Sequence, residues 1–166
     1  MASSPIDFVW WRTDASGSLD REQWREFDEA IQEIKYRMTI DHIASGRDAV
    51  DQAMRERING HTVREVLTTG YGFMLDRLNI ERAESIKVIT TNARLVTRPG
   101  DTASADYLRK RRKAESDALA VTLEKIRQAE TKLKIYDPTF AVKRPDPPPA
   151  TPTEVTPDFE PPIRLR

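Results

Sequence analysis

A run of five consecutive cations is the strongest charge feature of the sequence. It comprises Arg109, Lys110, Arg111, Arg112 and Lys113. Such a cluster can neutralise nucleic-acid phosphates, with an affinity that falls as salt rises, or it can pair with an acidic surface on a partner protein. No aromatic residue interrupts the run, so it lacks the side chains on which bases stack. Both kinds of contact stay open, beside the plainer interpretation of a solvated helix face.

Two adjacent tryptophans, Trp10 and Trp11, form the second candidate binding element. We expect residues 1–11 to be extended, and in an extended chain adjacent side chains point to opposite sides. Packing of both rings on a helical body is the simpler interpretation. The alternative is a partner-facing anchor, because tryptophan is enriched at the energetic centres of protein interfaces.

Segment 11–20, which precedes a predicted helix, is similar to part of an EF-hand calcium loop. The matching positions are Asp14, Ser16, Gly17, Ser18, Leu19 and Asp20. Arg12 occupies the first ligand position and Gln23 the position of the bidentate glutamate, so the strongest carboxylates are missing. A turn over residues 13–18 that caps the following helix explains the same residues.

The sequence offers no catalytic constellation. His42 and His61 have no partner at the spacing of a recognised zinc site. The segment Gly70-Tyr71-Gly72 lacks the third glycine and the preceding strand of a nucleotide-binding loop, and we interpret it as a helix break. Neither a nucleophile elbow nor a cysteine nucleophile is present. We therefore predict no catalytic residue, no metal site, no cofactor and no enzymatic activity.

Composition narrows the class of protein further. The 166 residues include 27 cations and 27 carboxylates, so the net charge is zero, which argues against a dedicated nucleic-acid binder. The chain has no cysteine, which excludes disulfides and cysteine-based zinc sites and fits a reducing compartment. No stretch approaches the roughly 18 apolar residues of a membrane span, and the N-terminus lacks the basic segment of a signal peptide. We expect a soluble protein that is neither secreted nor membrane-spanning.

Apolar residues that recur every three or four positions predict an all-α helical bundle. The expected helices cover residues 19–44, 48–58, 62–69, 73–96 and 103–136. A turn at 98–101 joins the last two helices, which should pair as a long antiparallel hairpin. The seam of the last helix is a weak heptad, because Glu115 and Thr122 interrupt its apolar positions. The chain then divides into an extended N-terminal segment (1–17), a helical domain (18–136) and an arm (137–166).

The arm is defined by proline, since nine of the eleven prolines lie within residues 137–166. This density excludes a helix or a central strand, and it predicts a polyproline-like segment of up to roughly 90 Å at about 3.1 Å per residue. Spaced apolar residues along the arm are candidate partner contacts: Phe140, Val142, Val155, Phe159, Ile163 and Leu165. An isolated arm of this kind buries too little surface to offset its chain entropy, so we expect a neighbouring subunit to hold it.

This layout, with a hairpin over 73–136 followed by an arm over 137–166, resembles that of the head–tail adaptor (connector) proteins of tailed bacteriophages. Those proteins form rings beneath the portal and grip it with extended arms. The resemblance implies a non-enzymatic structural adaptor in a homo-oligomeric ring, found in the virion or the host cytoplasm. Its arm would dock on a neighbour such as the portal.

A DNA-binding packaging accessory, similar to small terminase subunits, is the alternative function. It would contact DNA through a helix-turn-helix within residues 47–78 and through the cation run 109–113. The proposed recognition segment, residues 62–69, offers Arg64 and few other side chains that read bases.

Overall fold

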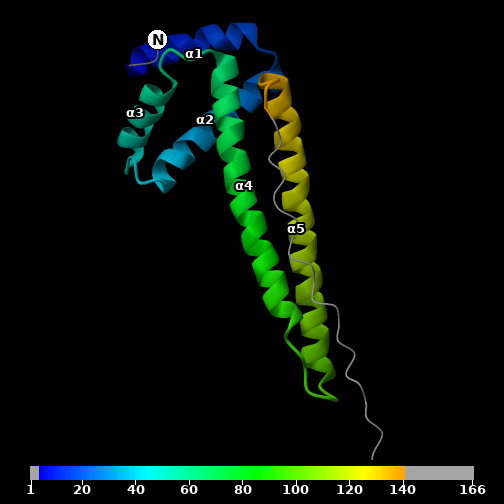
Figure 1. Ribbon diagram of the computed structural model, residues 1–166. Coiled ribbons are helices and arrows are strands. Elements are labelled where there is room, and N and C mark those ends of the chain that lie inside the picture. Colours follow the sequence, from blue (N-terminus) through cyan, green and yellow to red (C-terminus); the bar gives the residue numbers. More distant parts are fainter. Residues whose placement is uncertain (1–3, 141–166) are drawn as a thin grey trace, which may run out of the picture.

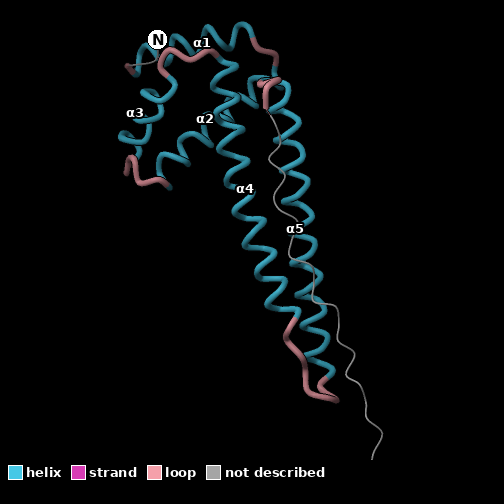
Figure 2. The backbone as a smooth tube through the Cα atoms, viewed as in Figure 1, coloured by secondary structure: helices cyan, strands magenta, loops and turns pink. Residues whose placement is uncertain are grey.

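The computed structural model describes residues 4–140, apart from the side chain of Ser16, and these residues form five helices joined by short loops (Figures 1 and 2). The helices are α1 (Pro5–Ser18), α2 (Arg21–Ile40), α3 (Arg47–Ile58), α4 (Val63–Ala93) and α5 (Thr102–Tyr136). Residues 4–140 contain no β-strand, so the all-α prediction is confirmed for this part of the chain. Most of the proposed arm lies outside the described residues.

The N-terminal segment is a helix, which corrects the prediction of an extended chain with a turn at 13–18. Ser4 caps α1, since its hydroxyl accepts a hydrogen bond from the Asp7 amide at 3.1 Å, and Pro5 occupies the start of the helix. Proline suits this position because its fixed φ is already helical and its missing N–H would have no intrahelical partner. Helix α1 continues to Ser18, so the segment that is similar to a calcium loop is mostly helical and does not form such a loop.

Helix α2 begins at a capping box and ends earlier than predicted. The Asp20 carboxylate accepts hydrogen bonds from the backbone amides of Glu22 and Gln23, and the Gln23 side chain accepts one from the Asp20 amide. The helix ends at Ile40, four residues short of the predicted end at residue 44. His42 then adopts a φ of +54°, a left-handed conformation that terminates helices.

Helix α4 runs without interruption through Gly70, Tyr71 and Gly72, which corrects the predicted helix break. The predicted helices 62–69 and 73–96 are therefore one helix of 31 residues, and Thr62 and Glu65 form the expected capping box at its start. Gly70 is required by tertiary packing, because it lies directly against Ala30 of α2. The glycine permits a close approach of two helices and does not end either of them.

Helices α4 and α5 lie side by side along their length and project beyond α1, α2 and α3 (Figure 1). The hydrophobic core occupies one end of this pair, where α2 crosses α4. Its buried residues are Phe27, Ala30, Ile31, Ile34, Met54, Ile58, Val66, Leu67, Tyr71, Leu75, Leu78, Ile126, Ala129 and Leu133. The pair extends well past the last of these core residues, to the loop 94–101.

Candidate functional site

The cation run 109–113 lies on α5 near the far end of the α4–α5 pair and is largely engaged within the chain. Arg109 pairs with Asp106 at 2.8 Å, Arg111 with Glu115 at 2.9 Å, and Lys113 with Asp117 at 2.7 Å.

Arg112 holds the end of α4. Its guanidinium donates hydrogen bonds to the carbonyl oxygens of Asn92, Ala93 and Leu95 at 3.0, 3.2 and 2.8 Å. A cation in this position satisfies orphan carbonyls and complements the negative end of the helix dipole. All five residues of the run remain exposed, and through Arg112 the run acts partly as a clamp on the helix pair.

The seam between α4 and α5 includes several polar side chains in this far half. Asn92 is buried and donates a hydrogen bond to Glu115 at 2.5 Å, while Arg111 donates a second one to the same carboxylate at 2.9 Å. These two hydrogen bonds lower the pKa of Glu115 and keep the carboxylate charged. Arg82 and Ser85 face the same seam from α4 at helical spacing. Ile89 of α4 and Leu108 and Leu119 of α5 are partly buried beside them, so the seam of the far half mixes polar and apolar side chains.

Apolar side chains also lie on the outside of the far half. Six large ones are exposed there: Ile80, Ile86, Val88, Tyr107, Val121 and Leu123. Large apolar side chains on the outer faces of a helix pair depart from the arrangement of a stable solvated hairpin, which turns such side chains inward. The outer surface of α4 and α5 is thus a candidate contact surface.

A groove of about 360 Å³ runs along one side of this far half, and we call it the hairpin groove. Its lining residues are Glu81, Glu84, Ser85 and Val88 from α4 and Glu115, Ala118 and Thr122 from α5. Its lining combines small and apolar side chains with three carboxylates, two of which lie on α4. A groove of this chemistry suits the apolar face of another helix that carries flanking cations.

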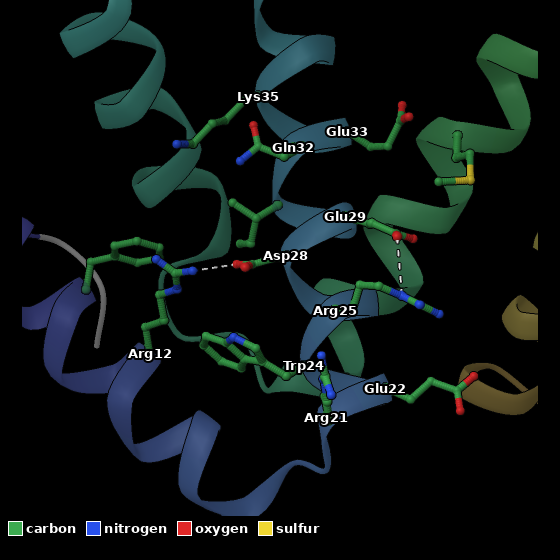
Figure 3. Close-up of a pocket in the computed structure, with 13 residues that line it drawn as sticks. Arg12, Arg21, Glu22, Trp24, Arg25, Asp28, Glu29, Gln32, Glu33 and Lys35 are labelled. Atoms are coloured by element: carbon green, nitrogen blue, oxygen red, sulfur yellow. Dashed lines mark hydrogen bonds and ion pairs between the residues drawn. The ribbon is translucent and has the colours of Figure 1, made fainter.

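A larger groove of about 1160 Å³ lies between α1 and α2 (Figure 3). Arg12 of α1 points at Asp28 of α2, with a contact of 2.6 Å, and its guanidinium lies 5.1 Å from the centre of the Trp24 ring. Arg25 is directed at Glu29 on the same helix at 3.7 Å. The cations of this groove are matched by carboxylates, and the Arg12–Asp28 pair connects α1 to α2. The groove therefore offers little excess charge to a ligand.

The structure separates the two tryptophans. Trp11 packs against Phe8 and against Phe27 of the core, with ring centres 5.9 and 5.5 Å apart. Trp10 is 66% exposed and shares the outer face of α1 with Ile6 and Val9. The helical conformation explains the difference, because adjacent residues on a helix are turned by about 100°. Trp10 is thus placed to meet a partner, whereas Trp11 belongs to the packing of the body.

A buried carboxylate, Glu26 of α2, is the feature that sequence reasoning missed. Its side chain is 5% exposed and accepts hydrogen bonds from Lys132 and from the Tyr136 hydroxyl, both of α5. The hydrogen bond to Glu26 raises the pKa of Lys132, and burial followed by the same carboxylate raises the pKa of Tyr136. The available signal was the position of Glu26 on α2. It lies four residues before Ala30, which is buried, and residues at this spacing share one face of a helix. This cluster ties α2 to the end of α5.

Of the apolar residues assigned to the arm, Phe140 is described, and it packs against the hydrophobic core of its own chain. Its ring therefore belongs to the packing of the helical body. Val142, Val155, Phe159, Ile163 and Leu165 lie outside the described residues.

Residues 4–140 contain neither a cluster of metal ligands nor a helix suited to cross a membrane. No group of three or more histidine, aspartate or glutamate side chains in this part of the chain is placed to hold a metal ion. No helix within the same residues combines the length and apolar character that crossing a bilayer requires. Comparison with known proteins gave no match to a family model, to a curated protein or to a solved structure.

Proposed function

We propose that this protein is a non-enzymatic structural adaptor that assembles with copies of itself through the α4–α5 pair. The observation that carries the proposal is the exposed apolar surface of the far half, where Val88 and Val121 face outward while the polar Asn92 and Glu115 occupy part of the seam. Full burial of an apolar side chain contributes about 1.5–3 kcal/mol, so covering several of them stabilises an assembly. The same side chains contribute no such free energy when they stay exposed in an isolated chain.

The outer face of α1 supports a second contact in such an assembly. Ile6, Val9 and Trp10 are exposed together on one side of this helix, at the end of the molecule opposite the loop 94–101 (Figure 1). A tryptophan flanked by aliphatic side chains is typical of an interface anchor. The body therefore offers one apolar surface at each end, as a component that bridges two neighbours requires.

The finer form of the proposal is a head–tail connector of a phage virion, in which residues 137–166 dock on a neighbouring subunit such as the portal. Its support is the layout of a helical body followed by a proline-rich segment. The anchored Phe140 adds to this support, since its ring packs against the helical body near the start of that segment. A tight anchor at the root of an arm limits the volume that the arm samples and raises the effective concentration of its binding residues near the body.

The alternative, a DNA-binding packaging accessory, draws support from the charge of the loop and the start of α5. Residues 94–113 carry seven cations and two carboxylates. Within the cation run, however, four of the five side chains already have partners in the chain. This arrangement reduces the charge that is free to neutralise phosphates, and we rank the alternative second.

Sedimentation velocity of the full chain tests the proposal. We expect a species heavier than the monomer whose share grows with protein concentration. A chain lacking residues 137–166 should keep its helical circular dichroism and its self-association but lose incorporation into the larger assembly. A full chain that stays monomeric contradicts the proposal. Tight binding of duplex DNA at low salt, with an affinity that drops steeply as salt rises, would favour the alternative instead.

A further inference from the structure

We infer that the partner of the α4–α5 pair is a second copy of this chain, packed antiparallel through the face that contains the hairpin groove. The inference rests on the proposed self-association. It specifies the face that forms the contact, the partner, and the relative orientation of the two copies. The observations that carry it are the shared face of the exposed residues, the distribution of charge along the pair, and the area available.

The residues that would form the contact between two copies share one face of α5. Tyr107, Ala114, Ala118, Val121 and Lys125 follow spacings of 7, 4, 3 and 4, which place them on one side of a helix. Each of these five residues is exposed, so a single copy leaves the whole face uncovered.

This face continues into the hairpin groove, because Ala118 also lines that groove together with Val88 and Glu84 of α4. Alanine at two adjacent turns of α5 lets another helix approach closely, while Val88 and Val121 supply apolar area. The combined face is therefore shaped for a helix of the same kind.

Charge is unevenly distributed along the pair. The far end, residues 94–113, has seven cations against two carboxylates, whereas the adjoining segment 114–124 has three carboxylates and no cation. Glu81 and Glu84 add negative charge along the α4 edge of the groove.

A parallel arrangement of two copies would bring the positive far ends together, and like charges in contact are unfavourable. An antiparallel arrangement keeps the positive far ends of the two copies apart. With the two-fold axis near residue 116 of α5, residues 109–113 of one copy lie opposite the uncharged residues 119–123 of its partner, beside Glu124. Glu115 and Asp117 lie near the axis, where each is already paired with a cation of its own chain. Like charges are therefore separated in both halves of the contact.

The area of the face is adequate for a specific dimer. From residue 102 to residue 125, α5 is about 36 Å long at 1.5 Å per residue, and two adjacent helices are about 20 Å wide. The footprint is thus about 700 Å² on each copy and about 1,400 Å² in total, within the range of stable protein interfaces.

Cysteine cross-linking tests this arrangement cleanly, because the natural chain has no cysteine. Three single variants of the full chain, Tyr107→Cys, Lys125→Cys and Ala118→Cys, alter exposed positions, and circular dichroism checks that each keeps its helices. A short thiol-to-thiol cross-linker is added to each variant alone and to an equal mixture of the first two.

In the antiparallel arrangement, residue 107 of one copy lies opposite residue 125 of the other. The mixture should cross-link into a covalent dimer, while Tyr107→Cys alone and Lys125→Cys alone should not, since like positions lie about 27 Å apart along the axis. Ala118→Cys should cross-link with itself, because its two copies are separated by about 6 Å along the axis.

Cross-linking of Tyr107→Cys with itself would overturn the inference in favour of a parallel arrangement. No cross-link in any sample, from a protein that sediments as a multimer, would place the contact on another face and overturn the inference while leaving the proposed function intact. A protein that sediments as a monomer would overturn both.

Discussion

Replacing Gly70 by alanine should destabilise the protein, although alanine is the better helix former. A β-carbon at this position would lie 2.5 Å from the α-carbon and 2.9 Å from the carbonyl oxygen of Ala30, and it would also overlap the Ala30 β-carbon. None of these atoms can rotate away, so α2 and α4 must separate. Separation disturbs a core that is buried on both helices.

The expected magnitude is the difference between two effects. An extra methyl group forced into a packed site costs about 1–3 kcal/mol, and contact with backbone atoms favours the upper end of that range. The better helix propensity of alanine returns about 1 kcal/mol. We expect Gly70→Ala to lower the free energy of unfolding by about 2 kcal/mol, and to lower the Tm by about 4–8 °C for a chain of this length.

Gly72→Ala is the matched control, because Gly72 lies two residues further along α4 and an added β-carbon there meets no atom within 4 Å. This variant should gain about 1 kcal/mol from helix propensity and raise the Tm by about 2–4 °C. Urea unfolding followed by circular dichroism measures both variants. Equal stabilisation by the two substitutions would refute the close approach of α2 and α4, and equal destabilisation would indicate that the helix is interrupted at these glycines.

Three further predictions concern the polar contacts. Lys132→Met leaves Glu26 buried without its cation and should lower the free energy of unfolding by about 1–3 kcal/mol in urea titrations, below the roughly 3–5 kcal/mol of fully buried pairs because Lys132 is a third exposed; an unchanged midpoint would contradict a buried pair. Arg112→Ala removes the clamp on the last carbonyls of α4 and should speed hydrogen exchange of the 90–95 amides by about fivefold, as loss of about 1 kcal/mol implies, whereas Lys110→Ala should leave that exchange unaltered. The raised pKa values of Lys132 and Tyr136 mean that the folded chain retains protons which the unfolded chain loses near pH 10 and above. Their stabilising contribution is therefore complete below about pH 10 and is lost as the pH rises further, so the Tm should fall as the pH is raised from about 10 to about 12, and a constant Tm over that interval would argue against the cluster.

Sequence patterns predicted the long helices because their signals are local. The apolar stripes located α3 and α5 to within a residue at each end, with predicted spans of 48–58 and 103–136, and the capping box at Thr62 located the start of α4. Caps and periodicity depend on residues within one or two turns, which a single sequence displays directly.

The errors arose where distant residues decide the structure. Gly70 looks like a helix break until its neighbour Ala30 is known, and Ala30 lies forty positions away. The turn-forming residues around Gly17 outweighed the cap at Ser4, although Phe8 and Trp11 gain enough contact with the body to keep α1 helical. Glu26 gave only a weak signal because its partners belong to the last turns of α5. The polar side chains in the seam and the apolar exterior of the far half likewise became visible only when α4 and α5 were seen together.

The mass of the protein in solution tests the central claim most directly. Static light scattering should give the full chain a mass that is a multiple of 19.0 kDa. The double variant Val88→Arg/Val121→Arg should give 19.0 kDa with unchanged circular dichroism and Tm, because both valines are exposed in the single chain. A natural chain that remains at 19.0 kDa as its concentration is raised, or a double variant that assembles as well as the natural chain, would contradict assembly through this surface.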